Sequence, residues 1–313
     1  MGTPALSIDQ LPITFRGTVA PSEIDEMGHM NVRYYVHKAG QAAGHLFNMI
    51  GMGPDRRKRL GLIHAPLDHH VRFLKESHLA MPINARSGIV AIAPDCLRIY
   101  TEVLHATSGA VSATFTGDYV LTHGLHGERT NFPKDVLAAA EQYKCALPDY
   151  GAPRGINLPQ PTVIPNWQQA EALGLAEISR LEVGTDKIAA DGAVRPEYFI
   201  GTISDGIPAF LATIDVDRAA RLNDGVGGAA LEYRLFYFRR PEAGELTITR
   251  SGFIEVGNKT FLHGHWIFDQ NGKPLAATAA IAVTFDLKAR KSLPMPPAMR
   301  AAYEEKVVPG FAV

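Results

Sequence analysis

The chain is poor in cysteine and has no excess of charge of either sign. Its two cysteines, Cys96 and Cys145, lie far apart and lack metal-site spacing, which fits a reducing compartment. Lys and Arg number 31 against 32 for Asp and Glu, so no strongly basic face for nucleic acid or an anionic membrane is implied. We therefore expect a cytoplasmic protein that binds no nucleic acid.

Long apolar runs are absent as well. No uninterrupted apolar stretch approaches the roughly 18 residues of a membrane span. The first residues, MGTPALSIDQLP, lack the basic region and apolar core of a signal peptide, and Leu6 stands where a myristoylation motif needs Ser or Thr. We expect a soluble protein with no membrane partner, whose 313 residues form one large or two medium domains.

What the sequence does contain is an internal repeat. A shift of 164 positions places the tripeptide 86–88 on the identical tripeptide 250–252, Arg-Ser-Gly in both copies. The same shift, without a gap, matches further identical residues between positions 19 and 120: Val19 with Val183, Gly28 with Gly192, Tyr34 with Tyr198 and Thr114 with Thr278. The sequence therefore predicts a duplicated unit.

Each copy shows the same order of elements. In the first, residues 13–20 predict a strand, and residues 32–50 predict a helix that is apolar or small around most of its circumference. Four β-rich runs follow, and the second copy repeats them, with Asn271-Gly272 as the strongest hairpin signal. The predicted fold class is α+β, with two tandem units that each wrap an antiparallel sheet around a long central helix.

The composition changes between the two copies. Residues 147–165 contain five prolines, which is typical of a stiff linker, and Asn166 begins a short helix. We predict an N-terminal domain at 1–146, a linker with a short helix at 147–176, and a C-terminal domain at 177–313. The glycine-rich run 225–230 predicts a flexible loop.

One polar cluster separates the first strand from the central helix. In EIDEMGHMNVRYY, residues 23–35, Asp25, His29 and Asn31 lie within seven positions, and Gly28 permits a tight turn. The alternatives are an Asx turn or a helix cap for Asp25 and Asn31, and a functional site for the whole cluster. Capping explains an Asp or an Asn, but it does not explain the cluster.

The pattern Asp-x-x-Gly-His-x-Asn-x-x-Tyr, from Asp25 to Tyr34, resembles the hotdog acyl-CoA thioesterases of the 4-hydroxybenzoyl-CoA thioesterase type. A weaker resemblance to this group is H-x-R-F-L-K-E, from His70 to Glu76. The resemblance implies a double hotdog with an active-site motif in the first copy. At the 164 offset Asp25 and His29 become alanine and Asn31 becomes arginine, so the second copy has lost the motif.

The resemblance implies that Asp25 is the general base or the nucleophile of thioester hydrolysis. The helix N-terminus at Asn31–Tyr34 offers backbone N–H groups for an oxyanion, and Asn31 either orients water or only caps the helix. His29 would hold Asp25 or polarise the carbonyl. His70 would face the site from a strand, or it is merely packed.

The sequence thus predicts an acyl-CoA thioesterase that acts on a small or medium acyl group with no cofactor or metal, and that forms a homodimer of the fused chain. A hotdog hydratase or dehydratase and a non-catalytic acyl-CoA binding protein are the alternatives.

The charged run 55–59 is either a phosphate contact or, by our preference, a solvated loop. His263 and His265 lack acidic or thiol partners nearby, so zinc is not expected there.

Overall fold

A computed structural model describes residues 5–214 and 216–313. The chain divides into two compact units. Unit 1 comprises Met1–Pro153 with Ala190–Pro196, and unit 2 comprises Arg154–Ala189 with Glu197–Val313. The main division after Pro153 falls inside the predicted linker. The short segment Ala190–Pro196 belongs to the second repeat by sequence and nevertheless groups with unit 1.

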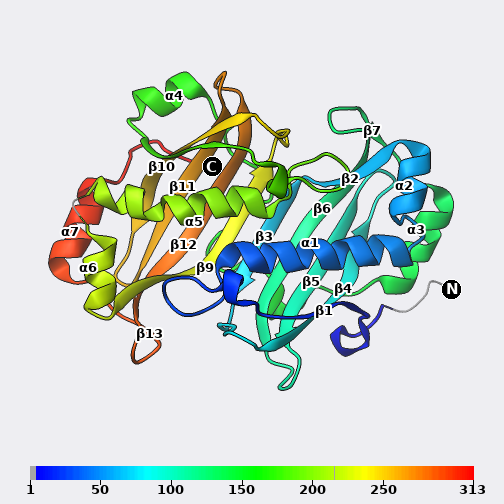
Figure 1. Ribbon diagram of the computed structural model, residues 1–313, viewed down its shortest axis with the longest axis horizontal. Helices are drawn as coiled ribbons and strands as arrows, with labels where there is room; N and C mark the ends of the chain where they lie inside the picture. The colour runs from blue at the N-terminus through cyan, green and yellow to red at the C-terminus, as the bar shows by residue number, and fades with distance from the viewer. Residues whose placement is uncertain (1–4, 215) are drawn as a thin grey trace. The chain divides into compact units, whose positions relative to one another are not determined.

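Unit 1 is an antiparallel sheet crossed by one long helix, α1 (Figure 1). Its strands run in the order β1-β4-β5-β6-β3, and β2 and β7 also pair with β6. The strands are β1 Ile13–Thr18, β2 Leu62–Pro66, β3 Asp68–Phe73, β4 Pro82–Ile92, β5 Leu97–His105, β6 Val111–His123 and β7 Arg129–Thr130. The helices are η1 Ile8–Gln10, η2 Pro21–Glu23, α1 Val32–Met49, α2 Pro54–Leu60, α3 Lys134–Ala140, η3 Glu141–Tyr143 and η4 Asp149–Gly151.

Helix α1 forms where the apolar periodicity predicts it, because its apolar positions pack against the sheet. Leu46, Phe47 and Ile50 are buried against Ile99 and Tyr119 from the strands. Burial of each such side chain stabilises the unit by about 1.5–3 kcal/mol. This packing fixes the axis of α1 and so the position of its N-terminal end.

Unit 2 repeats this arrangement with α5 lying on its sheet (Figure 1). Its strands run β9-β12-β11-β10-β8, with β13 paired to β12. The strands are β8 Ala176–Glu182, β9 Val226–Tyr237, β10 Leu246–Val256, β11 Thr260–Asp269, β12 Pro274–Asp286 and β13 Lys291–Ser292. The helices are α4 Trp167–Ala172, η5 Thr185–Lys187, α5 Glu197–Ala212, α6 Arg218–Asn223 and α7 Pro297–Glu305. The fold class is therefore α+β, with two hotdog units in tandem, as the sequence predicts.

The backbone keeps the repeat closely, but some turns differ in length. Gly28 and Gly192, which are 164 residues apart, both have positive φ values, 81° and 83°. The turn between β11 and β12 holds residues 270–273, whereas the turn between β5 and β6 holds 106–110. In unit 1 Phe115 stands opposite Thr101, and in unit 2 Thr278 stands opposite His265, which is 164 positions after Thr101. Phe115 and Thr278 therefore take equivalent positions in the two sheets. The gap-free match of Thr114 with Thr278 is wrong by one residue.

Two loop predictions are also wrong. Pro54–Leu60 is the helix α2, because Pro54 starts it and Gly61 ends it in the left-handed conformation. Gly227 and Gly228 lie in β9, paired with Phe285 and Thr284. A neighbouring strand supplies backbone hydrogen bonds to glycine as well as to any other residue, so the low strand propensity of glycine is overridden.

A buried polar chain lies on the sheet of unit 2. The Ser251 hydroxyl is 2.6 Å from His265 Nδ1, and His265 Nε2 is 2.6 Å from His263 Nδ1. In unit 1 the equivalent serine, Ser87, lies 2.7 Å from the Thr101 hydroxyl instead. The two histidines thus hydrogen-bond within the core.

Burial lowers the pKa of His263 to about 4 and holds that of His265 well below its usual value of 6.5. Below pH 6.5 His263 binds a proton in the unfolded chain, whereas in the folded protein it does so only near pH 4. Its contribution to the free energy of unfolding is therefore complete above pH 6.5 and is lost as the pH falls toward 4. From pH 7 to pH 5 we expect the free energy of unfolding to fall by about 2 kcal/mol because of this histidine alone. Denaturant unfolding at both pH values should show that His263→Leu removes this loss, whereas the exposed-site control His45→Gln keeps it. An unchanged loss in His263→Leu would contradict the assignment.

Candidate active site

The segment that precedes α1 is a closed loop. Ile24 and Met30 pair in an antiparallel bridge at its base. The Asp25 N–H donates to the His29 carbonyl at 3.0 Å, and the Gly28 N–H donates to the Asp25 carbonyl at 3.0 Å. Gly28 takes the positive φ that this turn requires. The loop therefore presents Asp25 and His29 from a defined backbone.

Asp25 is nearly buried, with 8% of its side chain exposed. Its Oδ1 accepts from the Met27 N–H at 3.0 Å, and its Oδ2 lies 3.5 Å from His29 Nδ1. Burial raises the pKa of Asp25, and the charge of His29 and the Met27 N–H oppose the rise. A raised pKa makes this carboxylate a stronger base than an exposed aspartate.

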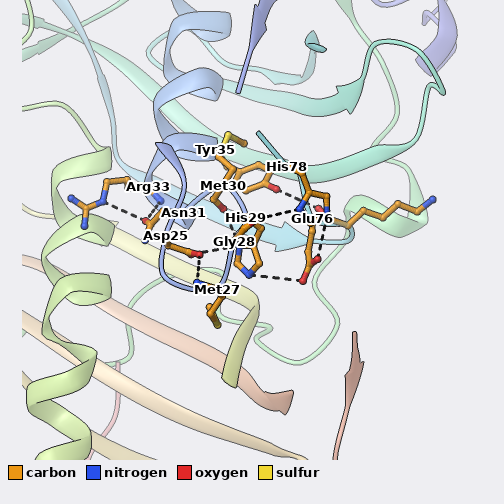
Figure 2. A network of polar contacts seen from close by, with 11 residues as sticks. Asp25, Met27, Gly28, His29, Met30, Asn31, Arg33, Tyr35, Glu76 and His78 are labelled. Carbon is orange, nitrogen blue, oxygen red and sulfur yellow. Dashed lines mark hydrogen bonds and ion pairs between the residues drawn. The ribbon is translucent and has the colours of Figure 1, made fainter. Parts of the chain in front are cut away.

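His29 lies between two carboxylates (Figure 2). Its Nδ1 faces Asp25, and its Nε2 is 3.9 Å from Glu76 Oε1. These distances are ion-pair distances and exceed those of hydrogen bonds. Such contacts in ligand-free sites often tighten when substrate binds.

Glu76 and His78 complete the cluster, and our sequence reasoning did not select either of them. Glu76 Oε2 is 3.6 Å from His78 Nε2, and His78 Nδ1 lies 3.2 Å from the Gly28 carbonyl oxygen (Figure 2). The available signal was the end of the H-x-R-F-L-K-E stretch, whose last residue is Glu76. The contacts run from Asp25 through His29, Glu76 and His78 and return to the loop.

Ser77 anchors the segment that carries Glu76 and His78. Its carbonyl accepts from the Met30 N–H at 2.8 Å, and its hydroxyl lies 3.3 Å from His105 Nε2. The Tyr35 hydroxyl donates to the Lys75 carbonyl at 3.4 Å, and burial raises the pKa of Tyr35 to about 12, so it stays protonated. Because Ser77 is buried in this way, the side chains on either side of it can meet the loop.

Asn31 is the N-cap of α1. Its Oδ1 accepts from the Arg33 N–H at 3.1 Å, and its carbonyl accepts from the Tyr34 N–H at 3.0 Å. The cap uses two of the donors that we expected to be open to an oxyanion. Between Asn31 and Tyr34, and within the described residues, the backbone N–H that has no hydrogen-bond partner is that of Val32. It lies at the positive end of the α1 dipole.

The structure does not bring His70 to this cluster. Its neighbours in β3 face α1, because His69 Nε2 is 2.8 Å from the Tyr119 hydroxyl and Phe73 packs edge-on against Tyr35. Successive side chains of a strand point to opposite faces, so His70 faces away from α1. There it stands opposite Thr116.

A buried ion pair holds the start of the loop, and no local pattern in the sequence predicts it. Glu23 Oε1 lies 2.7 Å from Lys38 Nζ, and Glu23 Oε2 accepts from the Ala20 N–H at 3.0 Å. The Glu23 carbonyl accepts from the Asn31 N–H at 2.9 Å. Glu23 therefore connects the segment after β1, the loop and α1.

Two arginines of the basic helix α2 form contacts with residues outside the helix. Arg56 forms an exposed bidentate pair with Asp135, at 2.6 and 3.0 Å. Arg57 donates to the Met52 carbonyl at 2.9 Å, and burial lowers its pKa while Asp191 opposes the shift. Lys58 and Arg59 are exposed. Within the described residues, no three His, Cys, Asp or Glu side chains gather as metal ligands would.

The sequence pattern of the thioesterase-like superfamily matches residues 19–140 and 183–303. The chain belongs to this superfamily. The matched stretches lie one in each repeat, so both copies carry the superfamily pattern. No curated protein sequence matches the chain. Across residues 5–214 and 216–313, no helix has the length and apolar character that a membrane crossing requires.

Several solved structures share the fold over most of their length. A Lactobacillus plantarum protein described as an oleoyl thioesterase has a TM-score of 0.69 and 11% identity, with 88% of this chain and 97% of that chain covered. An acyl-ACP thioesterase from Bacteroides thetaiotaomicron has a TM-score of 0.63 and 11% identity, with coverage of 86% and 96%. The 12:0-ACP thioesterase from Umbellularia californica also has a TM-score of 0.63 and 11% identity, with coverage of 86% and 94%. At this identity the likeness shows a common fold.

Proposed function

We propose that this protein hydrolyses acyl thioesters, with Asp25 as the general base or the nucleophile. The observation that carries the proposal is a nearly buried carboxylate whose pKa is raised by burial and which lies beside His29 at the start of α1. Membership of the thioesterase-like superfamily supports the reaction class. A carboxylate with these properties is suited to accept a proton from water or to attack a carbonyl carbon directly.

In the general-base route, Asp25 accepts a proton as water attacks the thioester carbon. The charge that develops on the carbonyl oxygen needs a donor, and the Val32 N–H at the positive end of α1 is the candidate. The C–S bond then breaks, and the thiolate takes up a proton. His29 limits the rotation of the Asp25 carboxylate and supplies positive charge beside it when protonated.

We propose CoA thioesters of small or medium acyl groups as substrates, as in the 4-hydroxybenzoyl-CoA thioesterase type that the loop motif resembles. Acyl carrier protein is the other carrier to test, because two structures that share the fold are named as ACP thioesterases. Both carriers present the acyl group on a phosphopantetheine arm, so the same thiol-release assay applies to both.

The test is thiol release by the purified full chain from saturated, branched and aromatic acyl-CoAs and from matching acyl-ACPs. We expect kcat/KM of about 10⁴ M⁻¹ s⁻¹ or more for the best substrate. Hydration of 2-enoyl-CoA without thiol release would favour a hydratase. Acyl-CoA binding without turnover would favour a binding protein.

A further inference from the structure

Thioester hydrolysis leaves a proton in the site. The products are a carboxylic acid with a pKa of about 4 and a thiol with a pKa of about 8.5. Near pH 7 the acid is ionised and the thiol is protonated, so water and thioester yield carboxylate, thiol and one proton. In the general-base route the thiolate recovers one of the two protons of water and Asp25 keeps the other. Asp25 must lose that proton before the next turnover.

Direct exchange with solvent is restricted at Asp25, but the exposure of the side chains rises steadily along the cluster. The exposed fraction is 8% at Asp25, 13% at His29, 26% at Glu76 and 50% at His78. Consecutive members are 3.5, 3.9 and 3.6 Å apart. Each member can bind and release a proton. The cluster therefore leads from a buried carboxylate to an exposed imidazole.

The contacts of His78 suit the last position in such a path. The Gly28 carbonyl oxygen, 3.2 Å from Nδ1, can only accept, so Nδ1 carries the hydrogen. His78 Nε2, which faces Glu76 Oε2, is then the nitrogen that accepts a proton. Burial lowers the pKa of His105 of β5, and the charges of Lys75 and His78 lower it further.

We propose that His78 is the solvent end of a proton outlet that runs from Asp25 through His29 and Glu76. The inference rests on the proposed thioester hydrolysis. In the tautomer that carries its hydrogen on Nε2, His29 accepts the Asp25 proton at Nδ1, which also lies 3.4 Å from the Met30 carbonyl oxygen. His29 then releases the Nε2 proton to Glu76, and Glu76 passes a proton to His78 Nε2. His78 then releases it to water or buffer. His78 does not touch the substrate; it restores the ionised form of Asp25.

The experiment compares wild type with His78→Gln in dilute buffer, with thiol release as the readout. Glutamine keeps a donor for the Gly28 carbonyl but cannot carry a proton. We expect kcat to fall about tenfold, with KM and the melting temperature unchanged, and added imidazole to restore kcat as its concentration rises. The matched control is His45→Gln, which removes an exposed histidine on α1 and should change nothing.

The outcomes separate the outlet from the proposed function. Full activity of His78→Gln in dilute buffer overturns the outlet, and so does a loss that imidazole does not repair. Failure of wild type to release thiol from any acyl-CoA or acyl-ACP overturns the hydrolase itself. Glu76→Gln provides the second variant, because it breaks the same path one step earlier and should also lower kcat with KM unchanged.

Discussion

Asp25→Asn is expected to lower kcat/KM for thiol release by about a hundredfold or more. The amide has nearly the shape of the carboxylate, but it neither accepts a proton from water nor attacks a carbonyl carbon. The loop hydrogen bond from the Met27 N–H can remain, because an amide oxygen still accepts it. The measurement is thiol release with the best substrate, alongside a melting curve that reports the fold.

The control for this variant is Glu26→Gln, which removes an exposed carboxylate from the same loop. We expect it to retain most of the activity, because the charge of Glu26 only adds to the rise in the pKa of Asp25. The base must be ionised, so wild-type kcat/KM should fall with decreasing pH around a pKa above the usual aspartate value. Near-wild-type activity in Asp25→Asn would refute the assignment of Asp25 as base or nucleophile.

Lys38→Ala is expected to destabilise the protein by about 3–5 kcal/mol. The substitution leaves the Glu23 carboxylate buried without its 2.7 Å partner, and an uncompensated buried charge is costly. Because Glu23 also binds the Ala20 and Asn31 N–H groups, we expect the loop that carries Asp25 to shift and thiol release to fall. Denaturant unfolding gives the free energy, and the thiol assay gives the effect on the loop.

The matched comparison is the double variant Glu23→Ala with Lys38→Ala. Removing both charges leaves no unpaired ion, so the double variant should lose less stability than the sum of the two single variants. An additive result would show that the two side chains do not stabilise each other. In that case the loop would be held by the backbone bonds of Glu23 rather than by the ion pair.

Local patterns in the sequence predicted the elements and their order. The apolar periodicity of residues 32–50 gives α1 at Val32–Met49, and the offset of 164 gives two units with matching loops at Gly28 and Gly192. The capping signal at Asn166 begins α4 as predicted. These predictions succeed because periodicity, caps and turns depend on residues within a few positions of one another.

Side-chain direction and long-range pairing decided the rest. His70 was selected from a motif, but strand alternation turns it away from α1, and Glu76 from the same motif meets His29 instead. The pairing of β9 with β12 overrode the glycine run at 225–230 that predicted a loop.

The sequence by itself therefore determined the fold class, the duplication and the polar loop around Asp25. Only the tertiary structure decided which distant groups meet that loop. Glu76 is 47 residues from His29, and the Glu23–Lys38 pair spans 15 residues with no periodicity to reveal it. Such contacts depend on where packing against the sheet places α1 and the segment after β3. No pattern within a single element contains that information.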